Sequence, residues 1–568
     1  MIFQSLLPPV PDLPFPNAHH LFLNRPDQSE WEDYVLHVDA ITGKARRWNE
    51  FKDRVKRAAT AFGNPDLFPH RENEIVGILS ENCVEYVALI HSLLAAGIPF
   101  ALFPASPTPY ELKHLVKVSK VKKVFTSPRN LQRARIIAKE AGFSESDGIY
   151  ILEGEVKGRR SFDDLVRSVK EPAKGYAKPV GKDALAYLVF SSGTTGPPKA
   201  VMMSHKNVMF SAMQGFIAGA LNRAVAPPPR STGIPVVLVP VPFYHSYGLS
   251  AFCFRGFSAP STLLIVPKWD LNLIPKLVPK WKVTMLPLVP PMMLQLLNSP
   301  EWAKADTSSI EITASGAAFL PPDLSAKFHS KLKSHMLHGY GSSETTLSIT
   351  GSMRENCIPG YKPVAGSVGL LMPGLEAKII RKDGANGGVG EPGELWVRGG
   401  CVFSGYFNDE EATSKALTKD GWLKTGDIFT IDEKQNFFFI EREKDTLKIS
   451  GVQVSPSELE IALLAQPDRL IDDVAVAGVS GGRTQGEKVP RAWIVLSQAG
   501  KRKGAAATIK ALEEWSQTNL TKQKWLRGGF EVMDEIPKLP TGKVLRRVLQ
   551  NAYEQERKTG TPTGKAKL

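Results

Sequence analysis

A run rich in hydroxyls and glycines carries the clearest chemistry in the sequence. Within nine residues it offers short side-chain donors, permissive backbone and one cation, at Ser191, Ser192, Gly193, Thr194, Thr195, Gly196 and Lys199. Glycines let backbone N–H groups turn toward a ligand, hydroxyls donate hydrogen bonds, and the lysine brings a mobile positive charge. An exposed loop would have a similar composition. Because the run directly follows the apolar, strand-like residues 184–190, we expect it to bind a polyphosphate.

Two common nucleotide motifs do not describe this run. A Walker A loop ends in Gly-Lys-Ser/Thr, whereas Lys199 follows Pro198. The later Gly-Lys pair at residues 542–543 continues with Val544 instead of a hydroxyl residue. The Gly-Tyr-Gly of residues 339–341 lacks the third glycine of the dinucleotide fingerprint. The phosphate chemistry therefore belongs to another class of site.

Five later segments add groups that suit a nucleotide and its metal. They are residues 337–344 (LHGYGSSE), 421–427 (GWLKTGD), 440–444 (IEREK), 448–453 (KISGVQ) and 537–543 (PKLPTGK). Glycines allow close approach of the backbone, and a carboxylate can hold Mg²⁺ against phosphates. Taken alone, such segments also occur as surface turns or solvated charge runs.

Taken together and in this order, the segments resemble the acyl-adenylate-forming (AMP-binding) superfamily over nearly the whole chain. The resemblance is closest to acyl-CoA synthetases and 4-coumarate–CoA ligases. It implies that ATP and AMP are bound by Ser191, Ser192, Gly193, Thr194, Thr195, Lys199, Ala317, His338, Gly339, Tyr340, Gly341, Ser343, Asp427 and Arg442. It also implies that Glu344 is the ligand of the Mg²⁺ that accompanies ATP. Two departures are Ala200 in place of the usual glycine and Ser343 in place of threonine, which keeps the hydroxyl.

The resemblance also implies which residues do chemistry. Lys543 is similar to the family's adenylation lysine, an ammonium that draws a carboxylate and the α-phosphate together. Lys448 resembles the lysine of the loop that enters the site for thioester formation, and His245 is the third catalytic candidate. Coenzyme A contacts are implied for Lys268, Lys444, Ser450 and Gly451. Relatives often carry a lysine at the position of Ser450 and an aspartate at that of Glu441.

The acyl pocket is the part of the site that the sequence describes least. The resemblance places His245, Tyr247, Ala251, Gly316 and Gly341 around the acid, although a histidine in an apolar segment is more often a core residue. Ala251 stands where 4-coumarate–CoA ligases have serine, and His338 where they have glutamine. We therefore do not expect hydroxycinnamate specificity to be inherited. Medium-chain fatty acids, benzoates, phenylacetates and cinnamates all remain open as substrates.

Composition and charge indicate what kind of protein this is and what kind of ligand it binds. The 568 residues exceed what one hydrophobic core usually serves, and 42% apolar with 23% charged residues is ordinary for a globular chain. The formal charge of +14 comes from basic residues spread along the chain, which favours small anions such as ATP and coenzyme A over nucleic acid. Four cysteines lie too far apart to indicate a metal site or a disulfide framework. No apolar run reaches the roughly 18 residues of a membrane span.

Alternating strand-like and helix-like segments predict an α/β fold with largely parallel sheets. We expect a large N-terminal AMP- and acyl-binding domain over residues 1–440, with a β-rich subdomain at about 366–440. A hinge at residues 441–445 would lead to a small, mobile α+β lid domain over 446–568. The expected elements include a strand at 74–79, a helix at 84–96, a helix at 457–464, strands at 474–479 and 492–496, and a helix at 507–520. The chain after Tyr553 is expected to lack order.

The final residues Ala566, Lys567 and Leu568 resemble a peroxisomal C-terminal address, with a small residue first. This predicts a peroxisomal import receptor as a partner and a peroxisomal location, otherwise a cytoplasmic one. A chance ending of a lysine-rich tail is the alternative.

Together these features predict an acid–thiol ligase. A carboxylate would attack Mg·ATP to give acyl-AMP and pyrophosphate, and coenzyme A would then displace AMP. The resemblance implies that the small domain rotates about residues 441–444 between the two steps. The alternatives are a luciferase-like monooxygenase, a stand-alone adenylation enzyme that loads a carrier protein, and an inactive nucleotide-binding protein.

Overall fold

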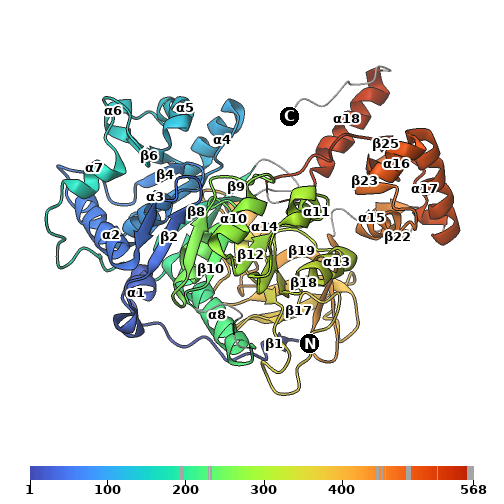
Figure 1. Ribbon diagram of the computed structural model, residues 1–568, viewed down its shortest axis with the longest axis horizontal. Coiled ribbons are helices and arrows are strands. Elements are labelled where there is room, and N and C mark those ends of the chain that lie inside the picture. The colour runs from blue at the N-terminus through green and yellow to red at the C-terminus, as the bar shows by residue number, and fades with distance from the viewer. Residues whose placement is uncertain are drawn as a thin grey trace. The chain divides into compact units, whose positions relative to one another are not determined.

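The computed structural model divides the chain into two compact units (Figure 1). One unit contains Ile2–Ala377 and Trp396–Lys424, and the other contains Lys378–Leu395 and Thr425–Leu568 together with Met1. The structure describes residues 1–191, 198–227, 229, 233–442, 447–449, 452–454, 456–481, 488–520, 522–540 and 542–559.

Six strands of the first unit form a mostly parallel sheet in the order β7-β6-β4-β5-β8-β9. Only β8 and β9 pair antiparallel. The strands are Ile149–Ile151 (β7), Val121–Thr126 (β6), Ile75–Leu79 (β4), Phe100–Phe103 (β5), Leu185–Ser191 (β8) and Lys199–Ser204 (β9). The strand expected at 74–79 is confirmed as β4, and all its residues are buried, as in a parallel sheet covered on both faces.

A second sheet of the same unit has nine strands, in the order β16-β15-β14-β13-β12-β10-β11-β2-β3. The six from β14 to β2 run parallel, and the strands at both edges pair antiparallel. The strands are Leu370–Leu371 (β16), Thr350–Gly351 (β15), His335–Tyr340 (β14), Ile312–Ser315 (β13), Met285–Leu288 (β12), Val236–Val239 (β10), Thr262–Ile265 (β11), Val35–Asp39 (β2) and Ala45–Arg47 (β3). The predicted α/β class with parallel sheets is confirmed.

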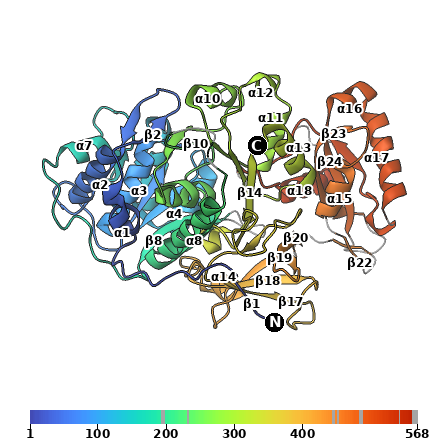
Figure 2. The same cartoon turned by 60° about the horizontal axis from the view of Figure 1, so that its bottom comes forward.

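Helices flank these sheets, as the views of Figures 1 and 2 show. Helix α3 (Val84–Ala96) is buried along its whole length and has the predicted bounds. It ends at Gly97, whose φ of 69° lies in the left-handed region that favours glycine. The other helices of at least five residues are α1 (Ala18–Leu23), α2 (Trp48–Phe62), α4 (Pro109–Ser119), α5 (Leu131–Ala141), α7 (Phe162–Arg167), α8 (His205–Ala224), α10 (Ile274–Trp281), α11 (Pro290–Leu297), α12 (Pro300–Lys304), α13 (Pro322–Leu332) and α14 (Glu410–Ala416).

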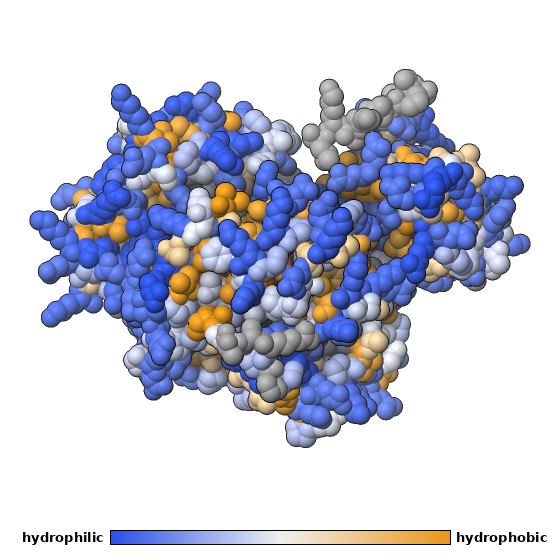
Figure 3. Space-filling model, in the orientation of Figure 1, coloured by the Kyte–Doolittle hydropathy of each residue, from blue (hydrophilic) through white to orange (hydrophobic). Residues whose placement is uncertain are grey.

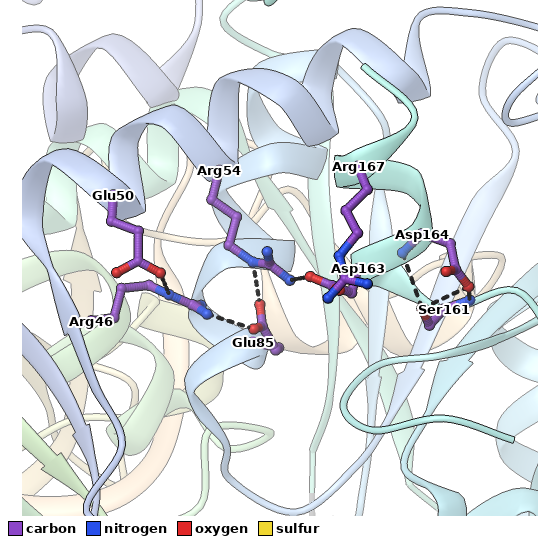
Figure 4. A network of polar contacts seen from close by, with 8 residues as sticks. All are labelled: Arg46, Glu50, Arg54, Glu85, Ser161, Asp163, Asp164 and Arg167. Carbon is purple, nitrogen blue, oxygen red and sulfur yellow. Dashed lines mark hydrogen bonds and ion pairs between the residues drawn. The ribbon is translucent and has the colours of Figure 1, made fainter. Parts of the chain in front are cut away.

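A buried ion network joins β3, α2 and α3 (Figure 4). Glu85, at the start of α3, accepts from Arg46 at 2.7 Å with one carboxylate oxygen and from Arg54 at 2.8 Å with the other. Arg54 also pairs with Asp163 of α7 at 2.8 Å. The network therefore fixes three helices against one another, and its central groups Arg46, Arg54 and Glu85 have little contact with water.

The second unit contains a three-stranded sheet of β23 (Ile471–Ser480), β24 (Lys488–Leu496) and β25 (Phe530–Val532). Strands β23 and β24 are antiparallel, and β24 and β25 are parallel. Its helices are α15 (Pro456–Leu464), α16 (Gln498–Lys503), α17 (Ala505–Asn519) and α18 (Arg546–Thr559). The predicted helices and strands are present, and both long strands start earlier than expected.

The structure corrects one expectation in this unit. Residues 554–559 do not lack order, because α18 continues to Thr559, and residues 560–568 lie outside the described part of the chain. Leu549 and Tyr553 pack against one face of the sheet, and this apolar contact holds the helix.

The helices of the described residues include none that is both long and apolar enough to cross a membrane. On the face drawn in Figure 3, hydrophilic side chains predominate and apolar ones form small groups.

Candidate active site

The predicted phosphate-binding run connects the two antiparallel strands at the edge of the six-stranded sheet. Ser191 is the last residue of β8 and Lys199 the first of β9, and the two are cross-strand partners. The strand expected before the run is confirmed. Ser192, Gly193, Thr194 and Thr195 lie outside the described residues.

Lys199 and Glu344 both contact Tyr406, a residue that the sequence analysis did not select. The ammonium of Lys199 lies 4.8 Å from the centre of the Tyr406 ring. The Tyr406 hydroxyl donates to Oε1 of Glu344 over 2.9 Å. Burial raises the pKa of Tyr406, and the neighbouring Glu344 carboxylate raises it further, so the phenol stays neutral and acts as a donor.

The single carboxylate of Glu344 suits Mg²⁺ better than it suits a metal that needs a protein cage. The described residues contain no group of three or more His, Cys, Asp or Glu able to hold a metal. Magnesium usually takes one or two carboxylates and completes its shell with phosphates and water. Glu344 is half-buried, and its hydrogen bond from Tyr406 engages only one of its two oxygens.

The glycines next to Glu344 are required by close backbone packing. A Cβ atom on Gly341 would lie 1.7 Å from the carbonyl oxygen of Leu347, and one on Gly339 would lie 2.5 Å from that of Thr350. Both positions therefore exclude any side chain. The polypeptide here follows the end of β14 and can approach a flat ligand closely.

Strand pairing brings two of the predicted nucleotide segments to one edge of the nine-stranded sheet. Ser315 at the end of β13 is the parallel partner of His338 in β14. Gly316 and Ala317 thus leave the sheet beside residues 339–341. Ala317 has a φ of 67°, a left-handed conformation that is uncommon for a residue with a side chain and that often marks a functional site. Ligands of such sheets bind at the carboxyl ends of the strands.

The predicted acyl-pocket segment contacts the same edge. The ring of Tyr247 packs on Gly316, where an added Cβ would lie 3.4 Å from the ring. Ser246 donates to the Ser343 hydroxyl over 3.0 Å, which ties the segment to the residue next to Glu344. Ala251 follows in a short π-helix, Leu249–Phe254. The structure therefore brings Tyr247 against Gly316 and joins their segment to the turn that follows Gly341, whereas the place of Ala251 in the acyl pocket stays a prediction.

His245, the fifth candidate, precedes the one-turn helix α9 (Ser246–Gly248). Burial lowers its pKa to about 4, so the imidazole is neutral at physiological pH. The chain before it is fixed by Asn82, whose amide donates to Val241 O and accepts from the N–H of Phe243, both over 2.8 Å. His245 therefore offers a neutral ring in a rigid segment and no positive charge.

Lys268 is exposed and follows β11 by three residues. Among the interactions of the described residues, none links Lys268 to the other site candidates. Its predicted contact with coenzyme A stays a prediction.

Asp427 and Arg442 form an ion pair in the second unit. They are cross-strand partners in β19 (Leu423–Ile431) and β20 (Phe437–Arg442), and Nε of Arg442 donates to Oδ1 of Asp427 over 2.7 Å. The Asp427 side chain is only 3% exposed, whereas that of Arg442 is 34% exposed. The pair thus fixes a carboxylate whose geometry suits two neighbouring hydroxyls of a ribose.

Two hydrophobic cores lie on opposite faces of the sheet of β23, β24 and β25. Val476 faces one core, which includes Leu447, and the next residue, Ala477, faces the other. Neighbouring residues of a strand point to opposite faces of a sheet. The second core contains Ile536, and Val544 packs against it.

These cores place the segments that carry the two predicted lysines on opposite faces of this sheet. Lys448 follows Leu447 in the hairpin of β21 (Leu447–Ile449) and β22 (Val452–Val454). Lys543 precedes Val544 in a turn closed by the hydrogen bond from Leu539 N to Lys543 O, 2.8 Å. Lys444, Ser450 and Gly451 lie outside the described residues.

The sequence carried only a weak signal for Tyr406. It sits in the segment Gly405-Tyr406-Phe407 shortly before α14. A glycine–aromatic pair before a helix is common in turns, so it does not point to a site without the contacts above.

Comparison with known proteins identifies the family to which the chain is similar. A model of the AMP-binding enzyme family matches residues 28–407. The probable 4-coumarate–CoA ligase 2 of Dictyostelium discoideum is 31% identical over 95% of this chain and 96% of its own length. The 4-coumarate–CoA ligase 1 of Arabidopsis thaliana is 30% identical over 97% of this chain and 95% of its own length. The crystal structure of ATP-bound MatB from Rhodopseudomonas palustris, 25% identical, superimposes with a TM-score of 0.81 over 95% of this chain and 99% of that one.

Proposed function

Because the chain belongs to the family of AMP-binding enzymes, we propose that it is an ATP-dependent acid–CoA ligase. A carboxylate oxygen of the acid attacks the α-phosphorus of ATP, the bond to the β-phosphate breaks, and pyrophosphate leaves with its charge. The thiol of coenzyme A then attacks the acyl carbon, loses its proton, and AMP leaves. The products are acyl-CoA, AMP and pyrophosphate.

The observation that carries the proposal is the contact of both Lys199 and Glu344 with one neutral tyrosine, Tyr406. Magnesium bound with ATP would neutralise part of the phosphate charge, and Glu344 is the residue that would hold it. Lys199 offers its charge to the leaving pyrophosphate. The full-length similarity to 4-coumarate–CoA ligases supports coenzyme A as the acceptor.

The acid would lie along Tyr247 and Gly316. The Tyr247 ring packs on Gly316, and its buried hydroxyl has no hydrogen-bond partner among the described residues. Such a wall suits a flat acid. A panel of substrates must identify the acid, since Ala251 and His338 differ from the serine and glutamine that the resemblance to 4-coumarate–CoA ligases leads us to expect.

A first experiment tests the reaction class. The purified protein is incubated with Mg·ATP, labelled pyrophosphate and a panel of aryl and alkyl acids, with and without coenzyme A. We expect acid-dependent ATP–pyrophosphate exchange and, with coenzyme A, acyl-CoA and AMP. Exchange without thioester would favour carrier loading or an oxygenase, and no exchange with any acid would contradict the proposal.

The opposite placement of Lys448 and Lys543 supports a division of labour between the two half-reactions. We propose that the small domain rotates about residues 441–445 to present Lys543 for adenylation and Lys448 for thioester formation. Lys543→Ala is then expected to abolish acyl-AMP formation and to spare thioester formation from supplied acyl-AMP, with the reverse for Lys448→Ala. Lys538→Ala is the matched control, because Lys538 lies in the same turn and its ammonium is already paired with Asp473 of β23, at 2.5 Å. Equal loss of both half-reactions in Lys543→Ala would contradict this division.

We also propose that Ala566, Lys567 and Leu568 direct the protein to peroxisomes through an import receptor; they lie outside the described residues. A fluorescent reporter that ends in these residues should enter peroxisomes, and one that ends in Ala-Lys-Ala should not.

A further inference from the structure

Tyr406 contacts two charges of opposite sign that belong to distant segments. Its ring lies 4.8 Å from the ammonium of Lys199, and its hydroxyl donates to Glu344. Within the described part of the chain, Lys199 forms no ion pair with an acid and Glu344 none with a base. Each charge therefore has Tyr406, a neutral residue, as its side-chain partner.

Backbone hydrogen bonds fix Tyr406 in this place. The chain before and after it pairs with β9, through Met202 N to Gly405 O at 3.0 Å and Phe407 N to Ala200 O at 2.8 Å. Phe403 N donates to the backbone carbonyl of Glu344 over 2.8 Å. One short segment is thus joined on one side to the strand that begins with Lys199 and on the other to the turn that carries Glu344.

Gly405 makes this approach possible. Its φ of 126° is in the region that favours glycine, and a Cβ there would lie 2.8 Å from Cγ2 of Thr413. The hydroxyl of Thr413 in turn accepts a hydrogen bond from Tyr406 N over 2.9 Å. The position of the ring is therefore set by the backbone and is not an accident of a flexible side chain.

Neutral partners suit charges that must later bind a ligand. A carboxylate beside Lys199 would compete with phosphate for the ammonium, and a guanidinium beside Glu344 would compete with a cation for the carboxylate. An aromatic ring attracts a cation without cancelling its charge, and a phenol orients a carboxylate oxygen while it remains ionised.

We propose that Tyr406 is a positioning residue for Mg·ATP, which orients the Glu344 carboxylate through its hydroxyl and the Lys199 ammonium through its ring. This inference rests on the proposed function, because it assumes that Glu344 and Lys199 meet the metal and the phosphates of ATP. It adds to that function a residue that touches neither Mg²⁺ nor ATP and acts through Glu344 and Lys199.

Equilibrium binding separates this role from a merely structural one. Dissociation constants for ATP are measured by calorimetry without any acid substrate, once with Mg²⁺ and once with EDTA. Tyr406→Phe is expected to weaken Mg·ATP binding about tenfold, as for loss of a hydrogen bond to a charged group, and to leave binding in EDTA within about twofold. Tyr110→Phe is the matched control, because Tyr110 is 85% exposed. Equal weakening in both buffers, or none in Mg²⁺, would overturn the proposal.

A double-mutant cycle with Glu344→Gln tests whether Tyr406 acts through Glu344. If it does, Tyr406→Phe adds no further loss of Mg·ATP affinity in the Glu344→Gln background. The same tenfold loss in both backgrounds would mean that the hydroxyl acts elsewhere, and would overturn the Glu344 arm of the proposal.

Tyr406→Leu tests the role of the ring. In EDTA it is expected to bind ATP about threefold more weakly than Tyr406→Phe does, because Lys199 loses its aromatic partner. No loss in EDTA would overturn the Lys199 arm. Tyr406→Phe could not be used if it melted below the assay temperature. Tyr406→His, which keeps a ring and a donor, is then compared with Tyr406→Leu. An equal gain of ATP affinity on adding Mg²⁺ in these two variants would overturn the proposal. Failure of the proposed function is distinguishable, because the wild-type protein would then show no ATP binding and no acid-dependent pyrophosphate exchange.

Discussion

Two glutamates of the first unit show how a buried network and a binding site use the same side chain differently. Glu85 is 9% exposed and has a guanidinium on each carboxylate oxygen, from Arg46 and Arg54 (Figure 4). Glu344 is half-buried and receives one hydrogen bond, from the neutral hydroxyl of Tyr406.

The difference lies in what remains for a ligand. Both oxygens of Glu85 are occupied by cations that are themselves buried, so any new partner would have to displace an ion pair. Glu344 keeps its charge available because its side-chain partner is neutral. A carboxylate that is matched by cations fixes structure, whereas one that is held by a neutral donor can receive a metal.

The largest expected effect is a loss of stability when Glu85 is changed in the buried ion network. Glu85→Gln removes the charge shared by two guanidinium groups, at 5% and 12% side-chain exposure, and leaves them only their more exposed partners Glu50 and Asp163. We expect a loss of about 3–5 kcal/mol in the free energy of unfolding, the usual cost of breaking a buried pair. Urea denaturation followed by fluorescence measures it, with Glu32→Gln on the surface as control. A loss under about 1 kcal/mol would mean that Glu85 is no more structural than Glu344.

A second prediction concerns how the stability of the protein depends on pH through His91, which lies in the same helix α3 as Glu85. His91 of α3 is fully buried, donates to Cys253 O at 2.7 Å, and has its pKa lowered to about 4 by burial. Below pH 6.5 the unfolded chain binds a proton that the folded chain refuses, so stability falls as the pH drops from about 6.5 to about 4 and levels off below. The full effect is roughly 3 kcal/mol for one such histidine.

His91→Phe should therefore flatten the pH dependence of unfolding by about one proton over this range. Two buried neighbours, His19 and His37, also have lowered pKa values and keep part of the slope. Urea midpoints between pH 4 and pH 7 measure the slope. An unchanged slope would show that His91 is protonated in the folded protein.

Glu344→Gln tests the other side of the comparison. We expect acid-dependent ATP–pyrophosphate exchange to fall about 100-fold, or roughly 2.7 kcal/mol, which is typical for loss of one preorganised electrostatic group. The amide can still accept from Tyr406, so the urea midpoint should not move by more than the equivalent of about 0.5 kcal/mol. A large drop in stability with unchanged exchange would reverse the assignment of the two glutamates.

The sequence predicted the elements better than the contacts between them. Helix α3 and strand β4 followed from local patterns, namely an apolar run closed by Gly97 and a short apolar run between polar residues. Glu344 was found because a carboxylate next to glycines in 337–344 has an evident chemistry. Local pattern was sufficient wherever the determining residues are neighbours in the chain.

Tyr406 could not be found in this way. It lies 62 residues from Glu344, and only the folded backbone brings the two together. The burial that makes Glu85 structural is also a tertiary property, since one sequence does not show that Arg46 and Arg54 approach it from β3 and α2. The order of residues 554–559 was missed because the helix is held by packing on a distant strand and not by its own composition.

The smallest expected effect marks the boundary of the network. Glu50 contacts Arg46 over 3.2 Å, but its side chain is 56% exposed. Water screens the pair, and Arg46 keeps Glu85 as a partner when Glu50 is changed, so Glu50→Gln should cost less than about 1 kcal/mol in a urea titration. A cost as large as that of Glu85→Gln would show that the network acts as one unit out to the solvent. The difference between the glutamates would then depend on which groups they contact and not on how deeply they are buried. Glu50 and Glu344 are both accessible to water, and they would differ only in their partner, which is a cation for Glu50 and a neutral phenol for Glu344.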